Sequence, residues 1–275
     1  MTRADNVSLM SDVVHLSNPA GRLYELAKTV VEKGSRLNDN HHIRSFVADY
    51  IGFDSADNAV YFAAIAEVMA LPVAVRRMVG ALERPVPSAA ILLRPIDQLE
   101  PVLPDLGVNG AGMRSFAARI AQSTVDGLEV TSEVLAHATK STAPTDESLT
   151  EIRDLANHMV DVMAGDDSLS PEFREAIRLH AQSIIDAVNR YKVNGTQALI
   201  TEADALVGVY VRHRDEAMRG NHPVMDALRK LVSRIMLATA LMGAPGSIAA
   251  TVDVFAALPA PTVIEAPAEV PTDGA

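Results

Sequence analysis

The stretch SPEFREAIRLHAQSIIDAVNRYKVNG, residues 170–195, decides the fold class. Ser170 is a favoured N-cap residue, and Pro171 suits the first helical position because its missing N–H needs no partner there. An Asn-Gly pair then gives the run a C-cap. We predict one long amphipathic helix over 171–193. Its apolar side follows helical spacing: Phe173, Ile177, Ile184, Val188 and Tyr191.

The same periodicity fills most of the chain. A 3,4,3,4 spacing in 147–164 predicts the narrow seam of a bundle contact. Its members are Leu149, Ile152, Ala156, Met159 and Met163. No segment alternates apolar and polar residues as a strand would. Further helices are expected over 19–33, 40–51, 55–82, 113–139, 197–218 and 224–242. We therefore predict an all-α, multi-helix bundle of roughly nine or ten helices.

In the 55–82 helix we expect Ser55 as the N-cap and Pro72 as a kink or division, because proline removes a backbone donor. Its inward residues are predicted to be Val60, Ile65, Val68, Met69 and Leu71.

Proline and glycine set the expected organisation. A break at 83–90 precedes a Pro-rich stretch that predicts short helical turns, and glycines at 107–112 predict a flexible joint. We expect a leader at 1–16, an N-terminal helical part at 17–106 and a long-helix bundle at 107–258. The acidic Pro/Ala-rich tail, 259–275, is predicted to be disordered.

Composition narrows the function classes. Hydrophobic residues make up 48% of the 275, so a folded core is expected. The net charge of -11 argues against nucleic acid as a partner, because such binding needs a cationic face. The absence of Cys excludes disulfides and thiolate chemistry and fits a cytoplasmic protein. The first residues lack the basic and apolar regions of a signal peptide.

The search for catalytic chemistry is negative. The glycines of 107–112 lack the Gly-Lys-Ser/Thr of a phosphate loop, and no His-Glu-x-x-His zinc motif occurs. The pairs Glu133–His137 and Asp154–His158 share helix faces, but salt-bridged or solvated pairs are the commoner explanation. His180 is interpreted as a hydrogen-bonded buried or boundary histidine rather than a base or pH sensor. We predict no catalytic, cofactor-binding or metal-binding residue, and hence no enzyme.

Candidate docking residues lie in two regions. The start LSNPAGRLYEL, residues 16–26, is interpreted as a helix start in which Arg22 and Tyr24 offer contact chemistry. Positive charge also gathers before an uncharged stretch at 235–252: Arg212, Arg214, Arg229, Lys230 and Arg234. That stretch is broken by Gly-Ala-Pro-Gly at 243–246. A buried hairpin is favoured, while an oligomer interface and membrane insertion stay open.

Two regions together carry a resemblance. NPAGRLYEL with FDSADNAVYFAAIAEVMALPVAVRRMV, and LSPEFREAIRLHAQSIIDAVNRYKVNGTQALITEADALVG, resemble a group of uncharacterised all-helical bacterial proteins of similar length. These begin with Asn-Pro-x-x-Arg-Leu and carry a long helix ending in Tyr-x-apolar-x-Gly. The resemblance implies a bacterial or phage source and a helical fold, and it implies no reaction. Some such proteins lie in mobile or defence-related contexts.

These observations favour a non-enzymatic bacterial or phage helical interaction protein with a regulatory, structural or defence-associated role. A protein partner or self-association as a homodimer is expected, since a Met-containing seam can serve a partner as well as a core. One alternative is a membrane-active effector using 224–258. The other is a helical enzyme or small-ligand-binding protein with a site between the two helical parts.

Overall fold

The structure is a computed structural model that describes residues 16–37, 41–53, 56–83, 87–108, 112–140, 143–165, 169–217 and 223–240. Within these residues it is 83% helix, with twelve helices, nine of them of at least seven residues, and no strands. The prediction of an all-α protein is therefore confirmed. The candidate leader apart from Leu16, the 243–246 break and the Pro/Ala-rich tail lie outside the described residues.

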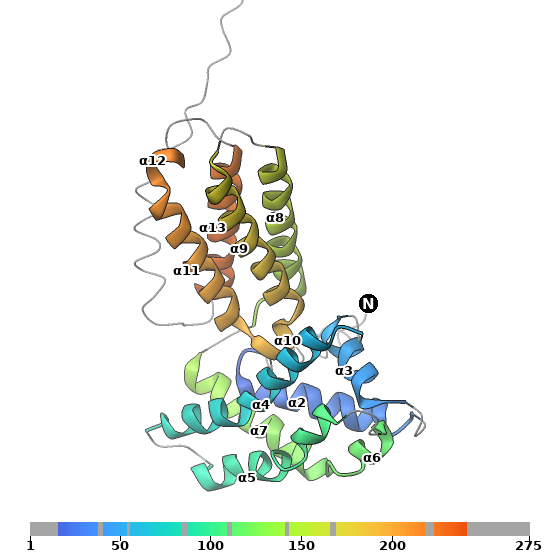
Figure 1. Cartoon of the computed structure of the whole chain (residues 1–275). Helices are drawn as coiled ribbons and strands as arrows, with labels where there is room; N and C mark the ends of the chain where they lie inside the picture. The colour runs from blue at the N-terminus through green and yellow to red at the C-terminus, as the bar shows by residue number, and fades with distance from the viewer. Residues whose placement is uncertain are drawn as a thin grey trace, which may run out of the picture.

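The first half of the chain forms one layered helical unit around its own apolar core. α2 packs against both α4 and α7, and α5 also packs against α4 and α7 (Figure 1). The elements are α2 (Pro19–Thr29), the π-helical turn η1 (Val30–Gly34), α3 (Ile43–Ile51), α4 (Asn58–Gly80), α5 (Ala89–Leu99), the 3-10 turn η2 (Leu103–Gly107), α6 (Met113–Ala117) and α7 (Gln122–Thr139). We call this unit the first part.

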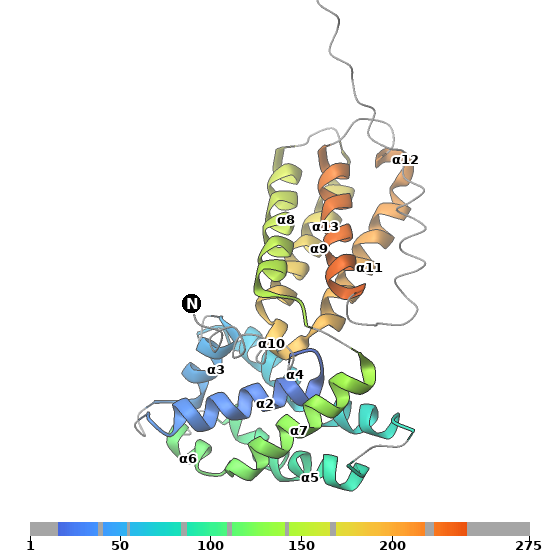
Figure 2. The same cartoon turned by 180° about the vertical axis from the view of Figure 1, so that it is seen from behind.

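The second half is a four-helix bundle. α8 packs on α9, α9 on α11, α11 on α13 and α13 back on α8, so the contacts close a ring around a second apolar core. The two views in Figures 1 and 2 show the bundle above the first part, with α10 between them. Its elements are α8 (Asp146–Gly165), α9 (Pro171–Asn189), α10 (Tyr191–Asn194), α11 (Thr196–Arg212), α12 (Arg214–Ala217) and α13 (Pro223–Ala240).

The cap and the apolar seam expected in the bundle are confirmed, but two helix lengths are wrong. The single helix expected over 171–193 is α9 and α10, and the one expected over 197–218 is α11 and α12. The Ser170 side chain accepts a hydrogen bond from the N–H of Phe173 and so caps α9. Ile152, Ala156, Met159 and Met163 are buried along α8, which packs against α9. The spacing of apolar residues thus placed the bundle contact correctly, because only one side of α8 is apolar enough to be buried.

The Asn-Pro start of α2 is a helix start that is also tied to a distant helix. Asn18 is buried, and its Oδ1 accepts a hydrogen bond from the N–H of Gly21 at 3.0 Å. Its Nδ2 donates to the carbonyl of Ser132 on α7 at 3.1 Å. Because both ends of the amide are satisfied, Asn18 fixes the entry of α2 against α7.

Several predictions about α4 are wrong. The helix begins after Asp57, whose carboxylate caps the N–H of Val60 at 3.0 Å, whereas Ser55 lies outside the described residues. It continues through Pro72, so of the expected kink or division the division is wrong. Met69 is 36% exposed, because α4 is covered by α2, α5 and α10 on other sides. Tyr61 takes an inward place that the sequence analysis did not assign, with its hydroxyl donating to the carbonyl of Leu106.

The core divides later in the chain than the proline and glycine pattern predicts. The expected single helix over 113–139 is two helices, with Ala121 extended between them. Both belong to the first core, so the two apolar clusters separate after α7 rather than near 107. The Pro-rich stretch also contains α5, an eleven-residue helix that runs through Pro95. Packing against α4 and α7 stabilises α5 despite the proline.

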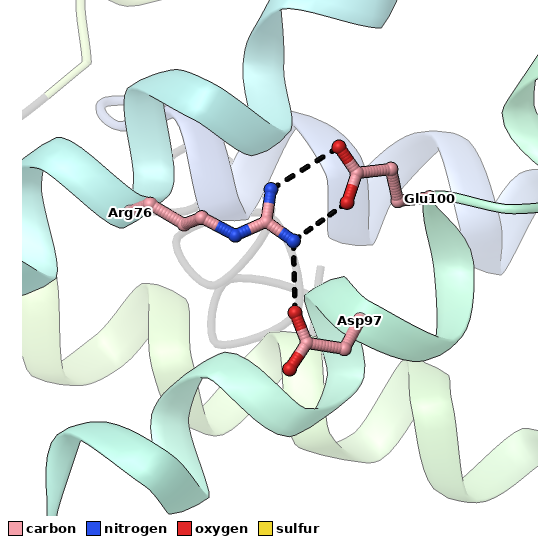
Figure 3. A network of polar contacts seen from close by, with 3 residues as sticks. All are labelled: Arg76, Asp97 and Glu100. Carbon is pink, nitrogen blue, oxygen red and sulfur yellow. Dashed lines mark hydrogen bonds and ion pairs between the residues drawn. The ribbon is translucent and has the colours of Figure 1, made fainter.

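A surface ion-pair network joins α4 to the end of α5 (Figure 3). Nη2 of Arg76 lies 2.6 Å from a carboxylate oxygen of Glu100 and 2.8 Å from one of Asp97. The Arg76 side chain is 35% exposed, so solvent screens the network and its contribution to stability is about 1 kcal/mol or less. Arg76 thus provides an arginine with ordinary surface partners for comparison with Arg22.

Candidate functional site

A cavity of about 520 Å³ lies where the four-helix bundle meets the first part. Its walls come from α4 on one side and from α9, α10 and α11 on the other, and Arg22 of α2 also contributes. Small-molecule sites commonly have volumes in this range and lie between structural units. The principal lining residues are Arg22, Glu67, Leu71, Asp186, Arg190 and Asn194.

The turn from α10 into α11 shapes one wall of this cavity. Gly195 has φ +63° and ψ -161°, a conformation that residues with a side chain rarely adopt. A Cβ at this position would lie 1.8 Å from Nη1 of Arg22. The guanidinium of the first part therefore packs directly on the backbone of the second, and only glycine leaves room for it.

Arg22 is a cation without a counter-ion among the described residues. Its Nε is buried and donates to no protein group, and no carboxylate pairs with its guanidinium within the part of the chain that the structure describes. Burial lowers the pKa of Arg22 to about 10, an effect that Tyr191 partly opposes. That pKa still leaves the side chain charged at neutral pH. Arg22 is half-buried, and a partly desolvated charge without a counter-ion opposes folding, so the arrangement calls for a functional explanation.

Glu67 and Arg190 form an ion pair across the junction. Nη1 of Arg190 lies 3.2 Å from Oε1 of Glu67, with the two side chains 25% and 31% exposed. Burial raises the pKa of Glu67, while the charge of Arg190 and a hydrogen bond from the Asn194 side chain lower it. The second oxygen of Glu67, Oε2, is buried without a hydrogen-bond partner among the residues that the structure describes. The ion pair therefore leaves one acceptor atom of the cavity unsatisfied.

Unsatisfied buried polar atoms converge at this one place. Besides Nε of Arg22 and Oε2 of Glu67, Oδ1 of Asn194 is buried without a hydrogen-bond partner in the described part of the chain. All three residues line the cavity. Most buried polar side-chain atoms in proteins are hydrogen-bonded, so a local group of exceptions indicates polar contacts made with something other than the protein itself.

The rim of the cavity carries further charges, and these are engaged. Nδ1 of His180 lies 3.2 Å from Oε2 of Glu202, which lines the cavity. The two side chains are 31% and 29% exposed. The interpretation of His180 as a hydrogen-bonded boundary residue is confirmed. Asp186 accepts a hydrogen bond from Gln182 one turn earlier at 3.3 Å.

Among the described residues, no group of three or more His, Asp and Glu side chains is placed to hold a metal ion. The pairs Glu133–His137 and Asp154–His158 thus gain no third ligand in that part of the chain.

The candidate docking residues occupy different surroundings. Arg22 alone lies at the cavity, whereas Tyr24 is buried in the first part and donates to Oε1 of Glu129 at 3.0 Å. Arg234 pairs with Glu151 and so joins α13 to α8. The others lie on the surface of the bundle: Arg212, Arg214 and Lys230 are exposed, and Arg229 lies 3.9 Å from Asp226.

Sequence reasoning missed most of the cavity. Glu67 is the single acidic residue in the apolar run AAIAEVMALPVAV, and that isolation was an available signal. The sequence analysis treats Asn194 and Gly195 only as a helix C-cap. An Asn-Gly pair at the end of a long helix also suggests a turn with a backbone conformation that favours glycine. No signal in the sequence pairs Gly195 with Arg22, because their contact depends on how the two parts pack.

Comparison with known protein families, curated proteins and solved structures found no match to the chain. The resemblance to uncharacterised helical bacterial proteins therefore stays a prediction.

One described helix, α4, is long and apolar enough to cross a membrane by length and composition. Core helices of soluble proteins meet the same criterion, and α4 contributes Tyr61, Ala64 and Val75 to the core of the first part.

Proposed function

We propose that this protein binds a small molecule in the cavity between its two helical parts and that it acts by binding rather than by catalysis. The observation that carries the proposal is the convergence of three buried, unsatisfied polar atoms, on Arg22, Glu67 and Asn194, in one cavity of about 520 Å³. A ligand that contacts walls from both parts would bias how they pack, which suits a regulatory role.

Binding is favoured over catalysis by the state of the charged groups. Oε1 of Glu67 pairs with Arg190, Glu202 faces His180 and Asp186 accepts from Gln182, so each lining carboxylate already has a partner at one oxygen. Apolar side chains supply much of the remaining wall, as in binding sites for small organic molecules.

A survey of co-purifying molecules tests the proposal. We expect native mass spectrometry of the full chain, purified gently from its host, to show an added small-molecule mass that denaturation releases. Ala70 lines the cavity and is exposed, so Ala70→Trp should fill the space and abolish that mass. Ala63→Trp is the matched control, because Ala63 is exposed on the same helix and does not line the cavity. A ligand-free wild type, or equal loss in both variants, would contradict the proposal.

Self-association is a second candidate function, favoured by one face of α4. Phe62, Met69 and Val73 are 49%, 36% and 55% exposed and follow helical spacing, so they form an apolar stripe. We propose that a second copy of the chain covers this stripe. Size-exclusion chromatography with light scattering should show a dimer that Val73→Glu dissociates. A monomer at all working concentrations would remove this candidate.

The membrane-active alternative is less favoured. The described portion of its segment, α13, places Leu228, Leu231 and Val232 in the core of the bundle. Those residues are thus committed to packing in the folded chain.

A further inference from the structure

We infer that the ligand of the cavity is a small amino- or hydroxycarboxylic acid whose carboxylate is held by Arg22. This inference rests on the proposed binding function and specifies the chemistry of the same site. It follows from the charges, the unsatisfied acceptors and the apolar wall of the cavity, taken in turn.

Arg22 is the cation available to an anionic group. Arg190, the other lining arginine, is paired with Glu67. A guanidinium presents donors in a planar fork that matches a carboxylate, and a charge-assisted contact of this kind gains strength in a desolvated setting. Gly195 has no side chain to cover the guanidinium, although it holds one side of it by close contact.

The local charge balance favours a single negative charge over two. Three carboxylates line the cavity with the two arginines: Glu67, Asp186 and Glu202. A dianionic phosphate near Arg22 would be repelled by these groups, whereas a carboxylate adds only one charge. The cavity therefore disfavours a dianion more strongly than a monoanion.

The unsatisfied acceptors call for donors on the ligand. Oε2 of Glu67 and Oδ1 of Asn194 are buried acceptors without protein partners, and both residues share the cavity with Arg22. An amine or hydroxyl group near the carboxylate would donate to such acceptors. A simple fatty acid would leave them unpaired.

The apolar wall accommodates the rest of the ligand. Leu71, Ala74, Ala187 and Val193 line the cavity. A branched or linear carbon chain of a few atoms would cover this wall and gain hydrophobic stabilisation. The class is therefore an acid with a donor group close to it and a short apolar chain.

Four matched probes test this class on the full chain: leucine, 2-hydroxy-4-methylpentanoate, leucinamide and 4-methylpentanoate. The readout is the Nε–Hε resonance of Arg22 in protein labelled with ¹⁵N-arginine. We expect saturable shifts with the first two at millimolar concentrations, which suit ligands of this size. Leucinamide lacks the carboxylate and 4-methylpentanoate lacks the donor, so both should bind at least about tenfold more weakly. Inorganic phosphate should cause no saturable shift.

Variants assign the effect to Arg22. Arg22→Gln should weaken leucine binding about 10- to 100-fold, followed through the Arg190 resonance, and Arg22→Lys should give an intermediate loss because the charge remains without the fork. Arg76→Gln is the control arginine, and it should bind like the wild type. Circular dichroism and thermal melting verify that each variant is folded. If Arg22→Gln does not fold, the conservative Arg22→Lys still tests the role of the guanidinium.

The outcomes separate this inference from the proposed function. Equal binding of leucine and leucinamide, or unchanged leucine binding by Arg22→Gln, would overturn the carboxylate assignment. The proposed binding function would still stand if a small molecule co-purified with the wild type and was lost in Ala70→Trp. Saturable phosphate binding at Arg22 would overturn it in favour of a different anion. The absence of any saturable shift with all four probes would overturn the assigned class outright.

Discussion

At the scale of single residues, a close contact between Arg22 and Gly195 joins the two helical parts beside the cavity. The arginine stacks where a Cβ would otherwise lie, and the glycine has a backbone conformation that other residues avoid. Each residue alone is unremarkable in the sequence, where Arg22 follows a helix start and Gly195 follows a helix end. Their importance arises from packing, so no local pattern could have revealed it.

Replacing Gly195 should destabilise the protein. Gly195→Ala combines a strained φ with a collision against the Arg22 guanidinium, and we expect a loss of about 2–4 kcal/mol in the free energy of unfolding, measured by urea denaturation. Gly208→Ala is the control. Gly208 is an exposed residue within α11 with open space around it, so the added methyl should stabilise by about 0.5–1 kcal/mol. Equal effects of the two substitutions would contradict the close contact.

Replacing Arg22 tests whether its charge serves folding or binding. Arg22→Met keeps an apolar stem and removes the unpaired charge. We expect the free energy of unfolding of the ligand-free protein to stay the same or rise by up to about 2 kcal/mol. Denaturant titration of ligand-free protein measures this. A loss larger than about 1 kcal/mol would mean that Arg22 mainly holds the two parts together.

At the scale of elements, the sequence predicted the bundle helices best. α8 and α9 have one apolar side and clear caps, so periodicity located them within a few residues. It failed where tertiary contacts override local preference. α6 and α7 are separated without a proline or glycine between them, while Phe116 and Ile120 pack into the core and Arg119 pairs with Asp105. The cavity combines α2, α4, α9, α10 and α11, and only the idea of a site between two helical parts was accessible from sequence.

The start of α9 should be sensitive to its cap. Ser170 caps the N–H of Phe173, and its hydroxyl donates to Oε2 of Glu216 at 2.9 Å. Ser170→Ala removes both bonds, so we expect a loss of about 1–2 kcal/mol in the free energy of unfolding, measured by chemical denaturation. Ser88→Ala provides a matched comparison, because Ser88 precedes α5 without a side-chain capping bond and should change stability by less than about 0.5 kcal/mol. Similar losses in both would disprove the capping role.

The contact between Ser170 and Glu216 also predicts how the stability of the protein changes at acidic pH. A hydrogen bond from the backbone N–H of Ser170 lowers the pKa of Glu216 most, and a smaller lowering comes from the Ser170 hydroxyl; burial opposes both, and His213 adds to the lowering. A carboxyl with a lowered folded pKa contributes stability above its unfolded pKa and loses that contribution as pH falls. Ser170→Ala keeps the backbone hydrogen bond to Glu216 and loses the one from the hydroxyl, so its stability should fall slightly less steeply below the ordinary carboxyl pKa than that of the wild type. If the free energy of unfolding fell identically with decreasing pH in the wild type and in Ser170→Ala, the contribution of the hydroxyl would be contradicted.

At the scale of the whole molecule, two apolar cores are joined through a short helix. Val193 of α10 packs in the first core, while Tyr191 of the same helix packs in the second. The Glu67–Arg190 pair and the Arg22–Gly195 contact lie beside it. The cavity therefore has walls in both parts, and its shape depends on how they are packed.

All five tyrosines are placed so that alkali should unfold the protein. Burial raises the pKa of Tyr24 to about 12, helped by the hydrogen bond to Glu129, and burial also raises the pKa values of the rest: Tyr50, Tyr61, Tyr191 and Tyr210. The folded state therefore holds more protons than the unfolded state above the ordinary tyrosine pKa of 10.0. Stability is intact below that pH and should fall as pH rises through it toward 12.

Phenolate absorbance measures this whole-molecule effect. In the folded protein the absorbance should rise later than in urea, and it should then rise together with loss of helical circular dichroism. Tyrosine ionisation that follows the same curve with and without urea would contradict the burial of these side chains.

The contact between Arg22 and Gly195 also has an evolutionary consequence. Two positions far apart in the chain constrain each other, since a larger residue at one requires a smaller or absent side chain at the other. In relatives that keep this architecture, we expect the two positions to change together. A joint substitution at these sites would therefore help to recognise distant relatives when overall sequence similarity has faded.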